Sequence, residues 1–414
     1  MIIGKGLEQG VISEEEVEEI SSKAFSEINL DDKKVLVIVP DISRTAPIEI
    51  FFRVFFNLIG ERVNHLDYLI ALGTHPPMNE EKIYQRVGIS AQERVDKYGM
   101  VRFFNHTWND ANTLQVIGTI PGDEIYEITH GLMNDATTVA LNKMVFEYDF
   151  LVMVGPTFPH EVVGFSGGNK YLFPGISGPE ILNMFHWLGA LITNPEIIGT
   201  KYTPVRKIID RAASFLPVPR LCFSLVVTKS GLNGLFVGTP EEAYSKAADL
   251  SAKLHIVHKL RSFHRVLSMA PLMYEDLWTA GKCMYKLESV VAEGGDLIIY
   301  APHISEVSYT HGEIIDQIGY HVRDYFVNKI DKFWDIPKGV LAHATHVKGI
   351  GTYENGVETP RINVILATQI PEERCRRINL GYIDPQAISP KDWEGREEEG
   401  ILLVRNAGEI LYQL

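Results

Sequence analysis

The chain has few of the residues that define several large classes of protein. Only three of its 414 residues are cysteines, Cys222, Cys283 and Cys375, and no two of them form a CxxC pair. A disulfide framework or a thiolate zinc site needs paired cysteines, so neither is expected, and the thiols are predicted to be buried or neutral. Basic residues are also scarce, since 39 Lys and Arg stand against 53 Asp and Glu, for a formal charge of −14. Nucleic acids and anionic membranes favour basic patches, so neither is an expected partner.

Long hydrophobic runs are missing as well. No run approaches the roughly 20 apolar residues that cross a membrane. Three glutamates, Glu14 to Glu16, stand where a signal peptide would be apolar, so we expect a cytoplasmic protein. At 414 residues the chain is long for one hydrophobic core, which favours two domains.

The loop 159–170, with the sequence PHEVVGFSGGNK, carries the residues best suited to chemistry. It follows a strand-like apolar run, 150–154, and its three glycines allow the backbone to approach a ligand closely. Lys170 places an amine at the end of the turn. A Walker nucleotide loop requires Gly-Lys-Ser/Thr, whereas Asn169 and Tyr171 flank this lysine, so a nucleotide site of that kind is not expected.

Two further motifs follow predicted strands near the amino terminus. Apolar runs at 35–39 and 66–72 predict strands, and the segment 48–59 between them predicts a helix, which together form a βαβ unit. The motifs DISRTAP at 41–47 and GTHPP at 73–77 come directly after the strands. Ligands bind at the carboxyl ends of parallel strands, so these motifs are expected to converge.

The rest of the chain continues to alternate helices and strands. Helices are predicted at 79–99 with a turn, 179–192, 241–254 and 276–292, the last ended by Gly294-Gly295. Strands are predicted at 148–154, 221–228, 235–237, 296–300 and 362–367, with a turn at 231–234. We therefore predict an α/β fold of two α/β domains, residues 1–260 and 261–414, with the active site in the cleft between them.

The motifs taken in order resemble the nickel-pincer lactate racemase family. The matching features are DISRTAP, GTHPP, the loop that runs from His160 to Lys170 and on to Phe-Pro-Gly at 173–175, and His186. The resemblance implies a racemase or epimerase of a 2-hydroxy acid, in which hydride passes from substrate C2 to the cofactor and back through a 2-keto acid. It implies nickel held by a pyridinium-3,5-bisthiocarboxylic acid mononucleotide that is linked covalently to Lys170, with His186 as the protein ligand. It also implies maturation by cofactor biosynthesis proteins.

The same resemblance implies roles for other residues. His75 and His160 are expected to exchange protons with the substrate hydroxyl on opposite sides of its carbon, a task that suits imidazole because it titrates near neutral pH. Arg44 and Lys282 are expected to bind the substrate carboxylate and assist catalysis, with Thr279 beside the substrate. The residues expected to contact the cofactor besides Lys170 are Asp41, Ser43, Ser166, Gly167 and Gly168.

Each of these residues also has a structural interpretation. Lys170 could be a surface lysine or bind a simple anion, and His186, beside Trp187, could be a packed core histidine. Arg44 could form an ion pair with Asp41 inside its own loop. His106, which follows another predicted strand, is expected to be structural.

The substrate is predicted from a departure from the family pattern. Trp278 and Thr279 stand where the lactate enzyme has Tyr-Gln, so a shorter hydroxyl replaces an amide beside the lactate site. Together with polar residues of the second domain, this favours a sugar acid such as an aldonate over lactate. Those polar residues are His303, His311, His343, His346 and Tyr353.

Other functions are kept as alternatives. One is a racemase of lactate or another short 2-hydroxy acid, and another is a cofactor-binding homologue without turnover. An NAD-dependent oxidoreductase is disfavoured because no GxGxxG follows the first strand.

Overall fold

The structure, a computed structural model, describes residues 2–414 and packs as two compact units. The amino-terminal unit contains the residues up to Phe158 together with Phe165–Leu182 and Lys201–Leu254. The carboxy-terminal unit contains His255–Leu414 and two segments from earlier in the chain, Pro159–Gly164 and Asn183–Thr200. Two domains divided at residue 260 remain a prediction, because packing units need not fold independently.

A seven-stranded sheet forms the centre of the amino-terminal unit, in the order β1-β11-β10-β7-β2-β3-β4. The strands from β10 to β4 run parallel, while β11 is antiparallel to both of its neighbours, β10 and β1. The strands of this sheet are β1 (Ile3–Gly6), β2 (Lys34–Pro40), β3 (His65–Ala71), β4 (Phe103–Asn105), β7 (Phe150–Pro156), β10 (Arg220–Thr228) and β11 (Gly231–Gly238). A separate hairpin pairs β5 (Leu114–Ile120) with β6 (Thr137–Asn142).

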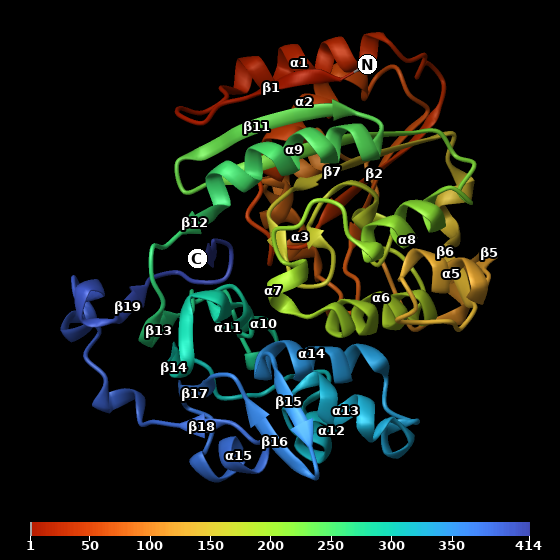
Figure 1. The fold of residues 1–414 in the computed structure, drawn as a ribbon. Coiled ribbons are helices and arrows are strands. Elements are labelled where there is room, and N and C mark those ends of the chain that lie inside the picture. Colours follow the sequence, from red (N-terminus) through yellow and green to blue (C-terminus); the bar gives the residue numbers. More distant parts are fainter. Residues whose placement is uncertain (1) are drawn as a thin grey trace. The chain divides into compact units, whose positions relative to one another are not determined.

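Helices cover this sheet, as Figure 1 shows for α1, α2 and α9. The helices of this unit are α1 (Glu14–Ser26), α2 (Ile48–Ile59), α3 (Glu80–Val87), α4 (Ala91–Asp96), α5 (Gly122–Ile128), α8 (Pro204–Ala213) and α9 (Pro240–His255). The apolar stripe of α2 includes Phe52 and Phe55, which are fully buried. Phe55 packs against Phe25 of α1 and Phe223 of β10 with ring centroids 5.1 and 4.8 Å apart. Such aromatic packing explains why β2, buried along six of its seven residues, reads as a continuous apolar run.

The carboxy-terminal unit is built on a second, fully parallel sheet, in the order β18-β17-β14-β13-β19. Its strands are β13 (Phe263–Met269), β14 (Val291–Ala301), β17 (Asn363–Thr368), β18 (Gly381–Tyr382) and β19 (Ile401–Val404). The shorter strands of this part of the chain are β8 (Pro159–His160), β9 (Gly164–Phe165), β12 (Ile256–His258), β15 (Gly351–Glu354), β16 (Val357–Pro360) and β20 (Leu411–Gln413). Its helices are α7 (Asn194–Ile197), α10 (Leu277–Ala280), α11 (Lys282–Tyr285), α12 (Gly312–Ile318), α13 (Arg323–Asn328), α14 (Lys338–Lys348) and α15 (Glu372–Arg377).

The helix α6 (Pro179–Ile192) has the bounds that the sequence predicted. Its first turn, to Leu182, belongs to the amino-terminal unit, and the remainder, from Asn183, belongs to the carboxy-terminal unit. The α/β fold class is also confirmed.

Two local predictions were wrong. The expected turn at 231–234 lies within β11, and the reversal occurs at Lys229–Ser230, because Leu232 is buried and pairs with Val227. The expected helix 276–292 is divided into α10 and α11, and its last residues form the start of β14. Val291 pairs with Phe263 there, so the β-branched residues at this point follow their strand propensity.

No helix among the described residues is long and apolar enough to cross a membrane.

Candidate functional site

The predicted motifs of the amino-terminal unit meet at one edge of its sheet. The strands β7, β2 and β3 are parallel neighbours, so the loops that leave their carboxyl ends lie side by side. The backbone N–H of Gly73, in the GTHPP loop, donates to the carbonyl of Gly175, five residues after Lys170, at 3.0 Å. The expected convergence of these motifs is therefore confirmed.

His75 and Asp41 form the central polar contact of this edge. The His75 Nδ1 atom is hydrogen-bonded to Asp41 Oδ2, and the side chain of His75 is 29% exposed while that of Asp41 is 8% exposed. Burial alone raises the pKa of the Asp41 carboxyl, but the His75 ring, its hydrogen bond and Arg44 outweigh burial and hold this pKa well below its usual range. Asp41 is therefore an ionised acceptor for His75 Nδ1–H, and this tautomer leaves the lone pair of a neutral ring on Nε2.

Ser43 and Arg44 complete this loop. Asp41 Oδ1 accepts from the Ser43 backbone N–H at 3.0 Å and from its hydroxyl at 2.6 Å. Arg44 Nη1 donates to Ser43 Oγ at 3.3 Å, so the carboxylate, hydroxyl and guanidinium form one chain of contacts. The half-buried Arg44 thus places a positive charge near His75, in a position to attract an acid substrate.

The glycine loop that leads to Lys170 has a backbone that only glycine tolerates. Gly167 has φ of 92° and Gly168 has φ of 60°. A Cβ atom at Gly167 would lie 2.3 Å from Thr157 Oγ1, so this position has no room for a side chain. Ser166, also buried, accepts the Phe158 backbone N–H at 3.0 Å. The two glycines, separated from Lys170 by Asn169, are therefore closely packed against neighbouring residues of the amino-terminal unit.

Arg206 and Asn169 hold this loop from behind. The guanidinium of Arg206 on α8 donates to the carbonyls of Gly167 at 3.0 Å and Phe165 at 2.6 Å, and it stacks 3.8 Å from the Tyr244 ring centroid. Asn169 Nδ2 donates to Asp210 Oδ1 at 2.9 Å and to Glu241 Oε1 at 2.6 Å. These contacts fix the loop while the half-buried Lys170 lies between loop and solvent. A rigid loop that ends in a lysine fits a group attached to that lysine.

His106 is a structural histidine, as expected. It is buried, its Nε2–H donates to the Ser177 carbonyl at 3.1 Å, and its Nδ1 accepts from Asn142 Nδ2 at 3.2 Å. Burial lowers the pKa of His106 to about 4, so the ring is neutral with both nitrogens bonded.

His160, in the carboxy-terminal unit, has two neighbours at one ring nitrogen. The Val162 backbone N–H donates to His160 Nδ1 at 3.1 Å, and Glu161 Oε2 lies 3.4 Å from the same atom. Lys286, which is buried, donates from Nζ to the Pro159 carbonyl. Burial raises the pKa of Glu161, but Lys286 and then His346 and Lys282 outweigh it, so the net pKa lies below the usual value and the group is a carboxylate.

His186 lies on α6 among other imidazoles of the carboxy-terminal unit. It is half-buried, and it interacts electrostatically with His311, His343 and His346, whose pKa values are lowered chiefly by burial. The pKa of His346 falls to about 4. His186 thus interacts with three imidazoles for which burial favours the neutral ring.

Trp278 stands between two of these imidazoles. Its ring stacks on His343 with centroids 3.9 Å apart and packs against His311 at 4.6 Å. Thr279 and Lys282, on α10 and α11, are half-buried, and Lys282 Nζ lies 4.7 Å from the ring centroid of Tyr274.

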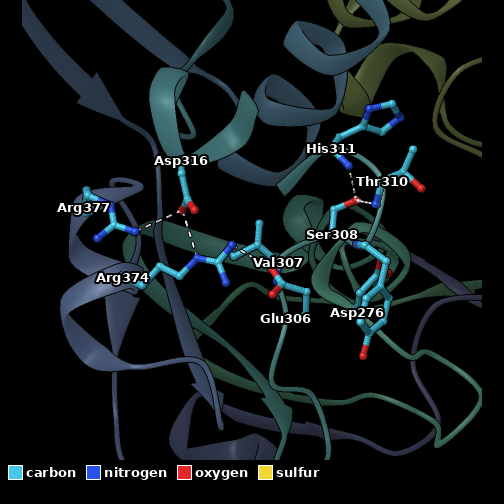
Figure 2. Close-up of polar contacts among 10 residues, drawn as sticks. Asp276, Glu306, Val307, Ser308, Thr310, His311, Asp316, Arg374 and Arg377 are labelled. Carbon is cyan, nitrogen blue, oxygen red and sulfur yellow. Dashed lines mark hydrogen bonds and ion pairs between the residues drawn. The ribbon is translucent and has the colours of Figure 1, made fainter. Parts of the chain in front are cut away.

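The loop before α12 is held by short polar contacts, shown in Figure 2. Ser308 Oγ accepts the backbone N–H groups of His311 at 3.1 Å and Thr310 at 3.3 Å. Arg374 pairs with Glu306 at 2.7 Å and with Asp316 at 3.0 Å. These contacts fix the backbone that carries His311.

Four of the five polar residues predicted to contact a longer substrate have partners within the protein instead. His343 Nε2 lies 3.4 Å from Tyr320 Oη, His346 Nδ1 lies 2.6 Å from Asn194 Oδ1, and His303 Nε2 lies 3.1 Å from the Tyr274 carbonyl. Tyr353 packs edge-on against Tyr325. His311 is the remaining candidate for a substrate contact.

The cysteines match their predicted character. All three are buried and free, and burial raises the pKa of Cys222 and Cys283 to about 12 and of Cys375 to about 11. Within residues 2–414, no group of three or more His, Cys, Asp or Glu side chains is arranged to hold a metal ion.

The predicted site residues are divided between the two units. The amino-terminal unit brings together Asp41, Ser43, Arg44, His75, Ser166, Gly167, Gly168 and Lys170, and the carboxy-terminal unit holds His160, His186, Thr279 and Lys282. Sequence reasoning missed the groups that support them, chiefly Glu161 and Lys286 beside His160 and Arg206 behind the glycine loop. Glu161 was visible as the neighbour of His160, whereas nothing near Arg206 or Lys286 in the sequence indicates their partners.

The chain resembles known proteins over most of its length. The family model described as the lactate racemase N-terminal domain matches residues 8–197. Lactate racemase of Thermoanaerobacterium thermosaccharolyticum is 23% identical over 287 residues, and that of Lactiplantibacillus plantarum is 22% identical over 289 residues. Each alignment covers 68% of this chain but only 63% of the relative.

Solved structures share the fold. A crystal structure of a Thermotoga maritima protein from a structural genomics consortium has a TM-score of 0.90 and 34% identity, and the match covers 98% of this chain and 99% of that one. The lactate racemase apoprotein of T. thermosaccharolyticum has a TM-score of 0.72 and 19% identity, with coverage of 100% and 94%.

Proposed function

The chain belongs to the lactate racemase-like family, and from this premise we propose that it is an isomerase that inverts C2 of a 2-hydroxy acid. The observation that carries the proposal is the edge of the amino-terminal sheet, where the His75–Asp41 pair, Arg44 and the rigid loop of Lys170 converge. An ionisable imidazole, a guanidinium and a lysine at the end of a glycine loop match the needs of acid–base chemistry on a bound hydroxy acid.

We further propose that Lys170 and His186 hold the nickel-pincer nucleotide, Lys170 through a covalent bond and His186 through nickel. When bound, this cofactor supplies the hydride acceptor and donor for C2. The rigid loop supports this assignment, because Arg206 and Asn169 fix the backbone that leads to the lysine. An imidazole on a helix is also a suitable ligand for nickel(II).

The remaining steps fall to side chains of the chain itself. Arg44 presents a planar fork of donors that suits the substrate carboxylate, and Lys282 is proposed as its second positive partner. His75 Nε2 accepts the hydroxyl proton while Asp41 stabilises the imidazolium that forms. His160 is proposed as the second acid–base group, which serves the substrate of opposite configuration.

The first test is chemical. Protein produced beside the cofactor's biosynthetic enzymes is expected to carry added mass on the peptide that contains Lys170 and to bind nickel. Lys170→Ala should lose both the mass and the nickel, whereas His186→Ala should lose nickel but keep the mass. Added mass on another lysine would contradict the assignment, and a loaded protein that turns over no 2-hydroxy acid would identify a cofactor-binding homologue.

We propose a sugar acid such as an aldonate as the substrate, with lactate or another short 2-hydroxy acid as the second candidate. Thr279 in place of a longer amide leaves space, and His311, fixed against Trp278, offers a polar group that a substrate hydroxyl can meet. A site with polar groups disfavours a substrate that leaves them unpaired.

A substrate panel separates the two candidates. Lactate, malate, an aromatic 2-hydroxy acid and an aldonate are compared at equal concentration with loaded enzyme. The aldonate is expected to have the highest kcat/KM. Lactate as the best substrate would refute the sugar acid while leaving C2 inversion intact.

A further inference from the structure

The Nδ1 atom of His160 has two neighbours, and each favours a different protonation state of that atom. The Val162 backbone N–H, 3.1 Å away, can only donate, so this contact requires a lone pair on Nδ1. In a neutral ring the proton then lies on Nε2. That tautomer cannot accept a proton at Nε2, so with this partner alone His160 has no base to offer a substrate.

The second neighbour favours the other tautomer. Glu161 Oε2 lies 3.4 Å from Nδ1, within ion-pair range, and a carboxylate can only accept. A proton on Nδ1 directed at Glu161 leaves the Nε2 lone pair available. Hydrogen bonds of catalytic groups are often long before substrate binds and shorten in the reacting complex.

Glu161 remains ionised because two lysines of its own unit, Lys286 and Lys282, act on its carboxyl group. Lys286 is 1% exposed, and its ammonium is fixed on the carbonyl of Pro159, two residues before Glu161. Lys286 is the strongest influence that lowers the pKa of Glu161 against the effect of burial, and His346 and Lys282 act in the same direction. A buried carboxylate held in its charged form next to an imidazole is a common way to orient that ring.

We propose that Glu161 is the positioning residue of His160, accepting Nδ1–H so that Nε2 can take a proton from the substrate hydroxyl. The substrate part of this inference rests on the proposed function. In the step, the substrate O–H bond breaks, its electron pair stays on oxygen, and the proton forms an N–H bond at Nε2. The resulting imidazolium donates Nδ1–H to the Glu161 carboxylate, and the proton returns from Nε2 to oxygen in the reverse direction.

In the amino-terminal unit, His75 and Asp41 form the same kind of imidazole–carboxylate pair, with the hydrogen bond already in place. The His75 Nδ1 atom makes this hydrogen bond to the Asp41 carboxylate. Each proposed acid–base imidazole thus has a buried or half-buried carboxylate at Nδ1, which is the pairing that reversible proton transfer by both rings requires.

The test replaces the carboxylate with its neutral isostere. In Glu161→Gln the imidazolium loses its charged partner, and kcat for the cofactor-loaded enzyme is expected to fall roughly 10- to 100-fold with little change in KM. Glu161→Asp, which keeps the charge, should recover part of the loss. Glu293→Gln, which removes an exposed carboxylate on β14 of the same unit, is the matched control and should change neither constant.

A second readout reports on the ring directly. Long-range ¹H–¹⁵N spectra of histidine-labelled protein, assigned with His160→Asn, should show a proton on Nδ1 of His160 in the wild type. In Glu161→Gln that signature should be lost in favour of Nε2–H. Identical His160 spectra in the two proteins, or a kcat within twofold of wild type for Glu161→Gln, would overturn the proposal. If the loaded wild type inverts no 2-hydroxy acid, the proposed function fails, while the spectra still decide the role of Glu161.

Discussion

The two units treat their histidines in different ways. In the amino-terminal unit, His75 is partly exposed, and its ring is hydrogen-bonded to the ionised carboxylate of Asp41. In the carboxy-terminal unit, His343 and His346 are buried, and their pKa values are lowered, chiefly by burial. The amino-terminal unit is therefore equipped for proton transfer, and these two rings of the carboxy-terminal unit for neutral packing and recognition.

The largest effect on turnover is expected when the Asp41 carboxylate, which orients the His75 ring, loses its charge. In Asp41→Asn the side-chain amide can donate to His75 Nδ1, which favours the tautomer with Nε2–H and removes the base. Turnover of loaded enzyme should fall roughly 10²- to 10⁴-fold, as for loss of a positioned proton-transfer group. Asp31→Asn, on an exposed ion pair with Arg62, is the control and should have no effect.

The same variant tests the role that the family resemblance gave to Asp41. If Asp41 acts through His75, Asp41→Asn keeps the added mass on Lys170 and loses only rate. Loss of the mass together with rate would instead assign Asp41 to the cofactor, as the sequence predicted.

His106 shows that burial, rather than membership of a unit, decides the charge of a ring. It lies in the amino-terminal unit, yet burial lowers its pKa from the usual 6.5 to about 4. The folded pKa lies below that of the unfolded chain, so the unfolded chain binds a proton first as the pH falls. Stability contributed by neutral His106 is therefore complete above about pH 6.5 and is lost as the pH falls toward 4.

This contribution can be measured by urea unfolding at pH 7 and pH 5. For the wild type, His106 should account for a loss of about 2 kcal/mol in the free energy of unfolding between these pH values. His106→Gln cannot titrate, so its free energy of unfolding should fall by that much less over the same range. An equal fall in the free energy of unfolding of both proteins would show that the protonation of His106 does not differ between the folded and unfolded chains.

The sequence predicted the amino-terminal edge better than the carboxy-terminal unit for a physical reason. Local signals define the first: strands of apolar residues end directly at Asp41 and Leu72, and parallel strands bring such ends together. The carboxy-terminal unit takes Pro159–Gly164 and Asn183–Thr200 from early in the chain, and no local pattern marks a segment that packs with residues far along the sequence. Glu161 was overlooked for this reason, since its ionisation depends on Lys286.

The smallest effect concerns backbone strain at one position of each unit. The glycine loop of the amino-terminal unit uses Gly167 where φ is 92°. In the carboxy-terminal unit, Thr193, between α6 and α7, has φ of 83° and ψ of 155°, a region that is almost exclusive to glycine. A β-branched residue there is strained by roughly 1–3 kcal/mol, whereas glycine loses roughly 0.5–1 kcal/mol of backbone entropy on folding.

Thr193→Gly should therefore raise the free energy of unfolding by roughly 1 kcal/mol. Thr310→Gly, an exposed threonine outside the positive-φ region of the same unit, is the control and should lower the free energy of unfolding slightly. If the two variants destabilise the protein equally, Thr193 is not strained.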